Sequence, residues 1–192
     1  PLVSVVIPTY NRAVLLSEAI ESVYDQTYRP IELIIVDDGS IDNTKHVVEF
    51  WKDTASKGDS IEILYIRQGN KGPNAARNLG LKHSSGRFVL MNDSDDILDR
   101  RRVELQVRKL VTEDADMCAA SFFSFPRRTQ MYRCPEHSKD VMLDFLLERI
   151  HGGTPIWMIS RDLLCHVGGY DEDLICYQDA DLTFRLLAAR PR

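Results

Sequence analysis

The sequence predicts an α/β fold in which a mostly parallel central sheet is flanked by helices on both faces. Over the first two-thirds of the chain, short apolar runs alternate with segments of helical periodicity. The apolar runs are nearly continuous, which is typical of strands buried on both faces. The connections are short, so successive parallel strands are expected to be joined by right-handed helical crossovers.

The strands are predicted from apolar runs that end at proline, glycine or acidic residues. The first run ends at Pro8, and the second is stopped by the sequence Asp-Asp-Gly-Ser. The last third of the chain is less regular, and residues 125–134 are expected to form either a hairpin or a loop. The predicted strands are Val3–Ile7, Ile31–Val36, Ile61–Ile66, Phe88–Met91, Met117–Phe123 and Ile156–Ile159.

The segments between these strands carry apolar residues at helical spacing. Asn11 and Asp42 precede the first two such segments and are expected to cap them, because their side chains can accept hydrogen bonds from free amides of a first helical turn. A third helix is predicted through Ala75, Leu79 and Leu81. Further helices are expected at residues 100–111, 141–150 and 179–189.

Length and composition favour one globular domain. The chain has 192 residues, of which 44% are hydrophobic and 28% charged, values that are ordinary for a globular protein. The net charge of −5 argues against a nucleic-acid partner, since nucleic-acid-binding proteins normally carry a basic face. The chain stops just after a helical pattern, which suggests a single domain, residues 1–192, excised from a longer protein.

The sequence favours a cytoplasmic location, either free or peripheral at the inner face of the membrane. No apolar run approaches the roughly 20 residues that a membrane span requires, and no basic segment precedes the first strand as it would in a signal peptide. The four cysteines include no C-x-x-C pair. Reduced thiols are therefore expected.

Polar clusters follow four consecutive predicted strands. They are Pro8-Thr9-Tyr10-Asn11, Asp37-Asp38-Gly39-Ser40, residues 67–72, and Asp93-Ser94-Asp95-Asp96. In an open α/β sheet, ligands bind beyond the carboxyl ends of the strands. Aspartates gathered at one edge repel one another, and a hard divalent metal with oxygen ligands is the cation that best offsets them.

Each cluster also has a purely structural interpretation. Aspartate, glycine and serine are common in tight turns for backbone reasons, and a lone D-x-D is a weak signal. The occurrence of such clusters at successive strand ends is what favours a binding site.

Five segments in order resemble the family 2 glycosyltransferases of the GT-A fold, a Rossmann-like architecture. The resemblance covers about residues 3–187, nearly the whole chain. It is carried by VSVVIPTYNR, IIVDDGSIDNT, NKGPNAARNLGLKHSSGRFVLMNDSDD, GGYDE (168–172) and QDADLTFRL (178–186). The resemblance implies a nucleotide-binding half at about residues 1–98 and an acceptor half at about 99–192.

The resemblance also implies roles for individual residues. Those matching the family's nucleotide-binding positions are Pro8, Thr9, Tyr10, Asp37, Asp38, Arg77 and Asp93. Asp95 matches the metal-holding member of the D-x-D pair, and the adjacent Asp96 is positioned to share that role. Asp179 matches the general base. Gln178 departs from the pattern, because the family often has glutamate there; this departure raises the prospect of altered substrate or reduced activity.

The implied function is transfer of a sugar, with inversion, from a nucleoside-diphosphate sugar to a hydroxyl group. UDP is the expected nucleotide, Mn²⁺ or Mg²⁺ the expected metal, and a saccharide or glycolipid the expected acceptor, as in polysaccharide biosynthesis. One alternative is a catalytically silent domain of the same fold that only binds a nucleotide or a partner. Another is a nucleotidyltransferase, but that class would carry a basic, glycine-rich loop after the first strand, and Pro8-Thr9-Tyr10-Asn11 stands there instead.

Overall fold

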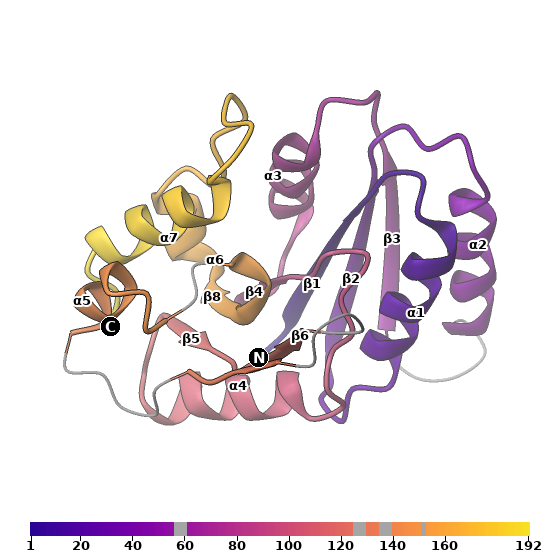
Figure 1. The fold of residues 1–192 in the computed structure, drawn as a ribbon. Helices are drawn as coiled ribbons and strands as arrows, with labels where there is room; N and C mark the ends of the chain where they lie inside the picture. Colours follow the sequence, from indigo (N-terminus) through magenta and orange to yellow (C-terminus); the bar gives the residue numbers. More distant parts are fainter. Residues whose placement is uncertain (56–60, 125–129, 135–139, 151–152) are drawn as a thin grey trace.

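The computed structural model describes residues 1–55, 61–124, 130–134, 140–150 and 153–192. Its centre is a six-stranded sheet with the order β3-β2-β1-β4-β8-β5 (Figure 1). The first four strands along the chain run parallel, and β8 runs antiparallel to both of its neighbours. The sheet strands are β1 (Val3–Thr9), β2 (Ile31–Asp37), β3 (Ile61–Arg67), β4 (Phe88–Met91), β5 (Met117–Ala119) and β8 (Trp157–Ser160).

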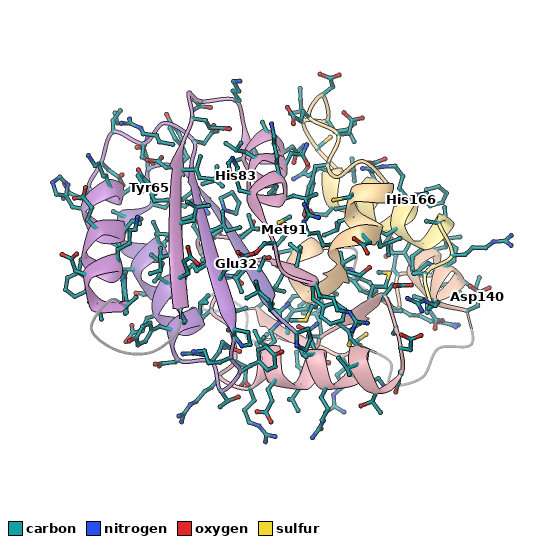
Figure 2. The ribbon with its side chains drawn as sticks, turned by 180° about the vertical axis from the view of Figure 1, so that it is seen from behind. Glu32, Tyr65, His83, Met91, Asp140 and His166 are labelled. Carbon is teal, nitrogen blue, oxygen red and sulfur yellow. The ribbon has the colours of Figure 1, made fainter. Side chains whose placement is uncertain are left out.

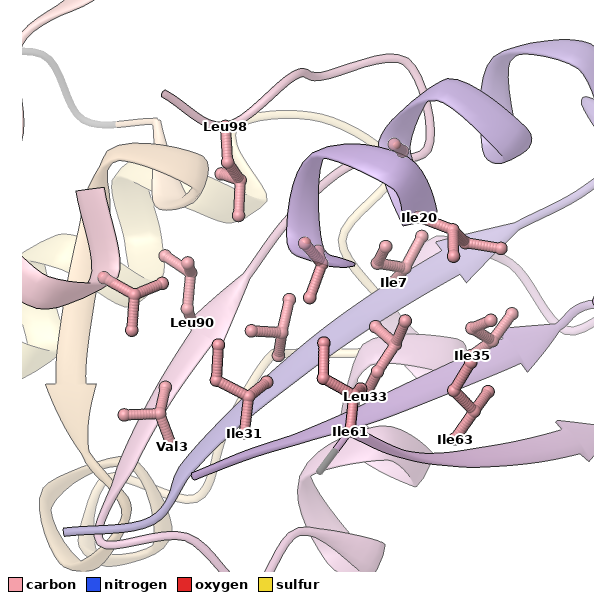
Figure 3. Close-up of a cluster of buried hydrophobic side chains, with 14 of the residues drawn as sticks. Val3, Ile7, Ile20, Ile31, Leu33, Ile35, Ile61, Ile63, Leu90 and Leu98 are labelled. Atoms are coloured by element: carbon pink, nitrogen blue, oxygen red, sulfur yellow. The ribbon is translucent and has the colours of Figure 1, made fainter. Parts of the chain in front are cut away.

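Helices cover both faces of the sheet, as predicted. The apolar cluster on one face includes residues of α1 (Ala13–Tyr24), α2 (Thr44–Ala55) and α4 (Arg102–Thr112). Figure 3 shows part of this cluster, in which α1 lies over the isoleucines and leucines of the parallel strands. The opposite cluster includes residues of α3 (Pro73–His83), α6 (Arg161–His166) and α7 (Gln178–Ala188). Burial on both faces explains why the strands read as continuous apolar runs.

The prediction for Met117–Phe123 was wrong in one respect. Strand β5 ends at Ala119, although the amide of Ala120 still donates to the carbonyl of Ile156, just before β8, at 2.9 Å. A separate strand, β6 (Phe122–Ser124), then pairs antiparallel with β7 (Gln130–Tyr132). The hairpin expectation is therefore confirmed for its described part, while residues 125–129 lie outside the described residues.

Two further elements of the last third differ from prediction. The helix expected at 141–150 is the shorter α5 (Val141–Leu146), because Glu148 adopts a left-handed conformation (φ 54°) that ends the helix. Helix α6 and the short 3₁₀ turn η1 (Thr154–Ile156) were not predicted. In the described part of the chain, no helix combines the length and apolarity that crossing a bilayer requires.

The capping prediction was right for Asp42 and wrong for Asn11. The Asp42 carboxylate accepts from the amide of Thr44 at the start of α2, and its second oxygen accepts from the amide of Ala13 at the start of α1. Asn11 is left-handed (φ 51°), and its side-chain oxygen accepts from the amide of Ile41. One aspartate thus serves two helices, and Asn11 fastens the turn after β1 to the turn after β2.

Helix α3 approaches the sheet closely at Gly80. A Cβ atom built on Gly80 would overlap the side chain of Val6 on β1 and would lie 3.3 Å from that of Val36 on β2. Only a residue without a side chain fits between this helix and these strands.

We predict that Gly80→Ala destabilises the fold by about 1–3 kcal/mol, because the added methyl group must displace packed strand side chains. Urea unfolding followed by circular dichroism measures the change. Gly69→Ala is the matched control, since a Cβ there meets no atom within 4 Å. Equal stability of the two variants would contradict the close approach.

Candidate active site

A polar pocket of about 390 Å³ lies at the carboxyl ends of β1, β2 and β4. It brings together most of the residues that the resemblance assigned to nucleotide and metal, from positions as far apart as 8 and 95. Its lining is Pro8, Thr9, Tyr10, Arg12, Asp38, Asn70, Gly72, Pro73, Ala76, Arg77, Asp93, Ser94 and Asp95. Asp37, Asp96 and Asp179 are not among these lining residues.

The turn after β1 offers the pocket an aromatic ring and a hydroxyl group. Tyr10 is 46% exposed, and Thr9 is buried. The Thr9 hydroxyl finds no hydrogen-bond partner among the described residues, and neither does Nε of Arg77. Buried polar atoms normally have a hydrogen-bond partner. Two buried polar atoms without a protein partner at one pocket are therefore what a site for a polar ligand would show.

Asp38 organises the loop after β3. One carboxylate oxygen accepts from Gln68 Nε2 at 2.7 Å and from the Lys71 amide at 2.8 Å, and the other accepts from the Gly72 amide at 2.8 Å. Beside it, Gly39 is left-handed (φ 88°), and a Cβ there would lie 3.1 Å from the backbone nitrogen of Asn70. The two loops are therefore held together tightly enough to form one wall of the pocket.

Asp37 faces away from the pocket lining and fixes its own turn. Its carboxylate accepts from the Ser40 amide at 2.7 Å and from the hydroxyl of Tyr65 at 2.6 Å, and Arg67 lies 3.8 Å away. Tyr65 is on β3 (Figure 2). Burial, followed by the hydrogen bond to Asp37, raises the pKa of Tyr65 well above its usual range, so the hydroxyl remains a donor at physiological pH.

The turn after β4 gathers three carboxylates, those of Asp93, Asp95 and Asp96. The buried side-chain amide of Asn92 stabilises the turn by donating to the backbone carbonyls of Asp93 and Asp96 at 3.2 and 3.1 Å. The Asp96 amide donates to the Asp93 carbonyl at 3.0 Å. The backbone therefore forces like charges together.

Three arginines from different elements offset these charges. Arg77 of α3 contacts Asp93 at 2.7 Å, and Arg12, just before α1, contacts Asp95 at 2.8 Å. Arg102 of α4 acts on Asp96 through its charge, and although burial lowers its pKa to about 10, it stays cationic at neutral pH. The sequence prediction considered only a metal for this task.

The remaining electrostatic repulsion acts on the carboxylate of Asp96. Burial, then the charges of Asp93 and Asp95, raise its pKa to about 6, against the opposing charges of Arg102 and Arg12. The neighbouring carboxylates are thus close enough to act on one another electrostatically.

A second cavity, of about 880 Å³, contains Asp179. Its other walls come mainly from the β6–β7 region and from α5, and they include Tyr132, Arg149 and Tyr177. Tyr132 stacks on Phe122 with ring centroids 4.5 Å apart. Asp179 lies in the first turn of α7.

Arg77 lines the first pocket and interacts electrostatically with Asp179, which lines the second cavity. It is buried, contacts Asp93, and has the ring of Tyr170 at 5.2 Å. The charges of Asp93, Tyr170 and Asp179 raise its pKa against the effect of burial. Asp179 therefore lies near enough to Arg77 for the two charges to interact across the boundary of the pocket.

Helix α3 also fastens the loop that leads to α7. The side-chain amide of Asn74 donates to the carbonyls of Asp171 and Leu174, and the side-chain amide of Asn78 donates to the carbonyl of Tyr170. In return, the backbone amide of Tyr170 donates to the side-chain oxygen of Asn78 at 2.8 Å. One helix thus carries Arg77 and positions the approach to Asp179.

The donor set suits a divalent metal that is shared with a ligand. Among the described residues, no three His, Cys, Asp or Glu side chains converge to hold an ion by themselves. Mg²⁺ and similar ions commonly bind through one or two carboxylates together with substrate phosphates. Asp95, with Asp96 beside it, offers hard oxygen atoms of that kind at the pocket.

Sequence reasoning did not single out Arg12, Asn70, Asn92 or Arg102. Asn70 could have been found, since it falls in the polar segment 67–72 after a strand, and Arg12 directly follows the cluster Pro8-Thr9-Tyr10-Asn11. Arg102 belongs to the basic run Arg100-Arg101-Arg102, a pattern that is typical of a solvated helix face. The buried role of Asn92 depends on the turn geometry, which the sequence alone does not give.

A family profile, Glycosyl transferase family 2, matches residues 4–164. The chain belongs to this family. It is 35% identical over 130 residues to "Glycosyltransferase GlyA" of Streptococcus pneumoniae, a match covering 68% of this chain and 18% of that protein. The matches span 14% to 59% of the length of the curated relatives, so the chain corresponds to part of each.

Solved structures share the fold. S. aureus TarS 1-349 in complex with UDP-GlcNAc superposes with a TM-score of 0.78 at 22% identity, covering 97% of this chain and 53% of that one. The mannosyltransferase PcManGT from Pyrobaculum calidifontis, in complex with GDP-Man and Mn²⁺, gives a TM-score of 0.69 at 22% identity, covering 92% and 49%. The predicted GT-A architecture is confirmed.

We predict that Asp96→Asn stabilises the ligand-free family 2 domain at pH 7.5 by roughly 1–3 kcal/mol. The fold raises the pKa of Asp96 from 3.8 to about 6, so it favours the neutral form. The associated stability is present below about pH 4 and is lost as the pH rises through about 6, whereas asparagine is neutral throughout. Urea unfolding in EDTA at pH 4 and pH 7.5 measures the difference.

Most of the gain should disappear at pH 4, where the Asp96 side chain is protonated in the folded state and only partly ionised in the unfolded state. Asp173→Asn removes one exposed carboxylate outside both cavities and controls for net charge. A gain that is equal at both pH values would contradict this account.

Proposed function

We propose that this domain transfers a sugar, with inversion, from a nucleoside-diphosphate sugar to an acceptor hydroxyl group. UDP is the expected nucleotide, and the acceptor is expected to be a saccharide or glycolipid. The observation that carries the proposal is the arrangement around Arg77. Arg77 lines a polar pocket that also holds Asp93 and Asp95, and its charge interacts with that of Asp179, which lines a second cavity.

The donor nucleotide would lie in the smaller pocket. The exposed ring of Tyr10 can pack on the base, and the unpartnered Thr9 hydroxyl can bond to base or ribose. Asp38 would contribute mainly by holding the loop that carries Asn70 and Gly72, because its oxygens already accept three hydrogen bonds. Asp93, fixed by Arg77, remains 31% exposed and can accept from the ribose.

The pyrophosphate would lie beside Asp95 and Asp96. Mn²⁺ or Mg²⁺, when bound there, supplies Lewis-acid stabilisation of the negative charge that develops on the leaving diphosphate. Asp95 would hold this ion, with Asp96 adjacent. The Mn²⁺ in the mannosyltransferase structure and the UDP-GlcNAc in the TarS structure support this ligand class.

Asp179 would act as the general base in the larger cavity. Its place in the first turn of α7 puts a carboxylate at the wall of a space large enough for a sugar acceptor. It would take the proton of the acceptor hydroxyl as that oxygen attacks the anomeric carbon. A single direct displacement inverts the configuration of that carbon, so one carboxylate base and one leaving group are sufficient.

We predict that one nucleoside diphosphate raises the melting temperature more with Mn²⁺ than without it, because a ligand that binds only the folded state stabilises it by about 3 kcal/mol at 100 times its Kd. A thermal-shift screen of nucleoside diphosphates measures this. Asp95→Asn should abolish the Mn²⁺-dependent part of the shift. A wild-type domain that responds to no nucleotide under either condition would overturn the proposal.

We predict that Asp179→Asn lowers the rate of UDP release from UDP-sugars by about 10²- to 10⁴-fold, the typical contribution of a general base. The nucleotide-induced thermal shift should be unchanged, since Asp179 does not line the donor pocket. Asp173→Asn, in the exposed loop before α7, is the matched control. A wild-type domain that binds nucleotide but turns over no donor with any simple glycoside or water would favour the silent binding domain instead.

A further inference from the structure

Arg12 forms an ion pair with Asp95, the carboxylate that the proposed function assigns to the metal. Its guanidinium lies 2.8 Å from Asp95, and both side chains line the donor pocket. A divalent cation bound to Asp95 would repel a guanidinium in contact with the same carboxylate. Arg12 and the ion are therefore competitors for Asp95.

The two arginine–carboxylate contacts in this turn differ in how easily they can be broken. The side chain of Arg77 is only 7% exposed, so separating it from Asp93 would leave a buried charge uncompensated. Arg12 and Asp95 are 47% and 45% exposed, and pairs of that kind contribute only about 0–1 kcal/mol. Asp95 is thus the one carboxylate in this turn whose arginine partner can leave at little cost.

The backbone that carries Arg12 is anchored on both sides. The Asn11 amide donates to Ser40 Oγ, Asn11 accepts from Ile41, and the Ala13 amide donates to Asp42. Motion is therefore confined to the Arg12 side chain, which can turn about a fixed point while it remains in the pocket.

We propose that Arg12 is an exchangeable counterion: it neutralises Asp95 in the empty pocket, yields that carboxylate to the metal, and then binds the donor diphosphate. This proposal rests on the proposed function. The chemistry favours the second contact because a planar guanidinium binds phosphate oxygens through two parallel hydrogen bonds. Arg12 would thus weaken metal binding to the empty domain and strengthen nucleotide binding to the metal-loaded one.

The test measures two affinities that the proposal moves in opposite directions. Without nucleotide, Arg12→Ala should bind Mn²⁺ several-fold more tightly than wild type, as followed by electron paramagnetic resonance of free Mn²⁺. With saturating Mn²⁺, the same variant should bind UDP about tenfold more weakly by titration calorimetry, through loss of a charge-assisted contact. Arg12→Lys keeps the positive charge but cannot form two parallel hydrogen bonds with a phosphate. Its affinity for UDP should therefore lie between those of the wild type and Arg12→Ala.

Lys45→Ala is the matched control. It removes one positive charge from an exposed pair on α2, with Glu49 at 3.6 Å, outside the pocket. Both affinities should stay at their wild-type values in this variant. Circular dichroism and the melting temperature establish that each variant is folded, and Arg12→Lys preserves the test if Arg12→Ala does not fold.

The outcomes separate this proposal from the function on which it rests. If wild type binds UDP with Mn²⁺ and Arg12→Ala behaves like the control, or binds Mn²⁺ alone more weakly, the exchange is wrong and the transferase proposal stands. If wild type binds no nucleoside diphosphate, the proposed function fails and the Arg12 proposal fails with it. Opposite changes in the two affinities support the exchange.

Discussion

The site depends on a repulsion that the fold creates and then offsets. Parallel strands bring their carboxyl ends to one edge, and the turn after β4 adds three carboxylates within four residues. The buried Asn92 amide keeps that turn closed, and arginines from α3, from the start of α1 and from α4 supply the compensating charge. The pocket therefore combines a turn that concentrates negative charge with arginines, from three different elements, that offset it.

The first half of the fold and most of the donor pocket could be predicted from the sequence. Strands buried on both faces leave continuous apolar runs, and their polar ends mark the binding edge. Thr9, Asp38 and Asp95 were found in this way, because each belongs to a polar cluster that follows a predicted strand. Here local pattern and tertiary structure agree.

The second half was harder to predict because its elements are short and set by tertiary contacts. Strand β5 has only three residues, and the end of α5 depends on the left-handed Glu148. Neither leaves a periodic signal. The pairing of Asp95 with Arg12 joins residues far apart in the chain, and the sequence does not specify such a contact.

Side chains of helix α3 hold the loop before α7 largely through the backbone groups of that loop. The side chains of Asn74 and Asn78 bind carbonyls and an amide of residues 170–174, whereas Glu172 and Tyr170 also contact α3 through their side chains. Two large side chains in the following segment, Ile175 and Tyr177, are 98% and 81% exposed. Docking of this kind tolerates sequence change, so evolution or a protein engineer can vary residues 173–177 while the connection between the two halves of the site stays intact.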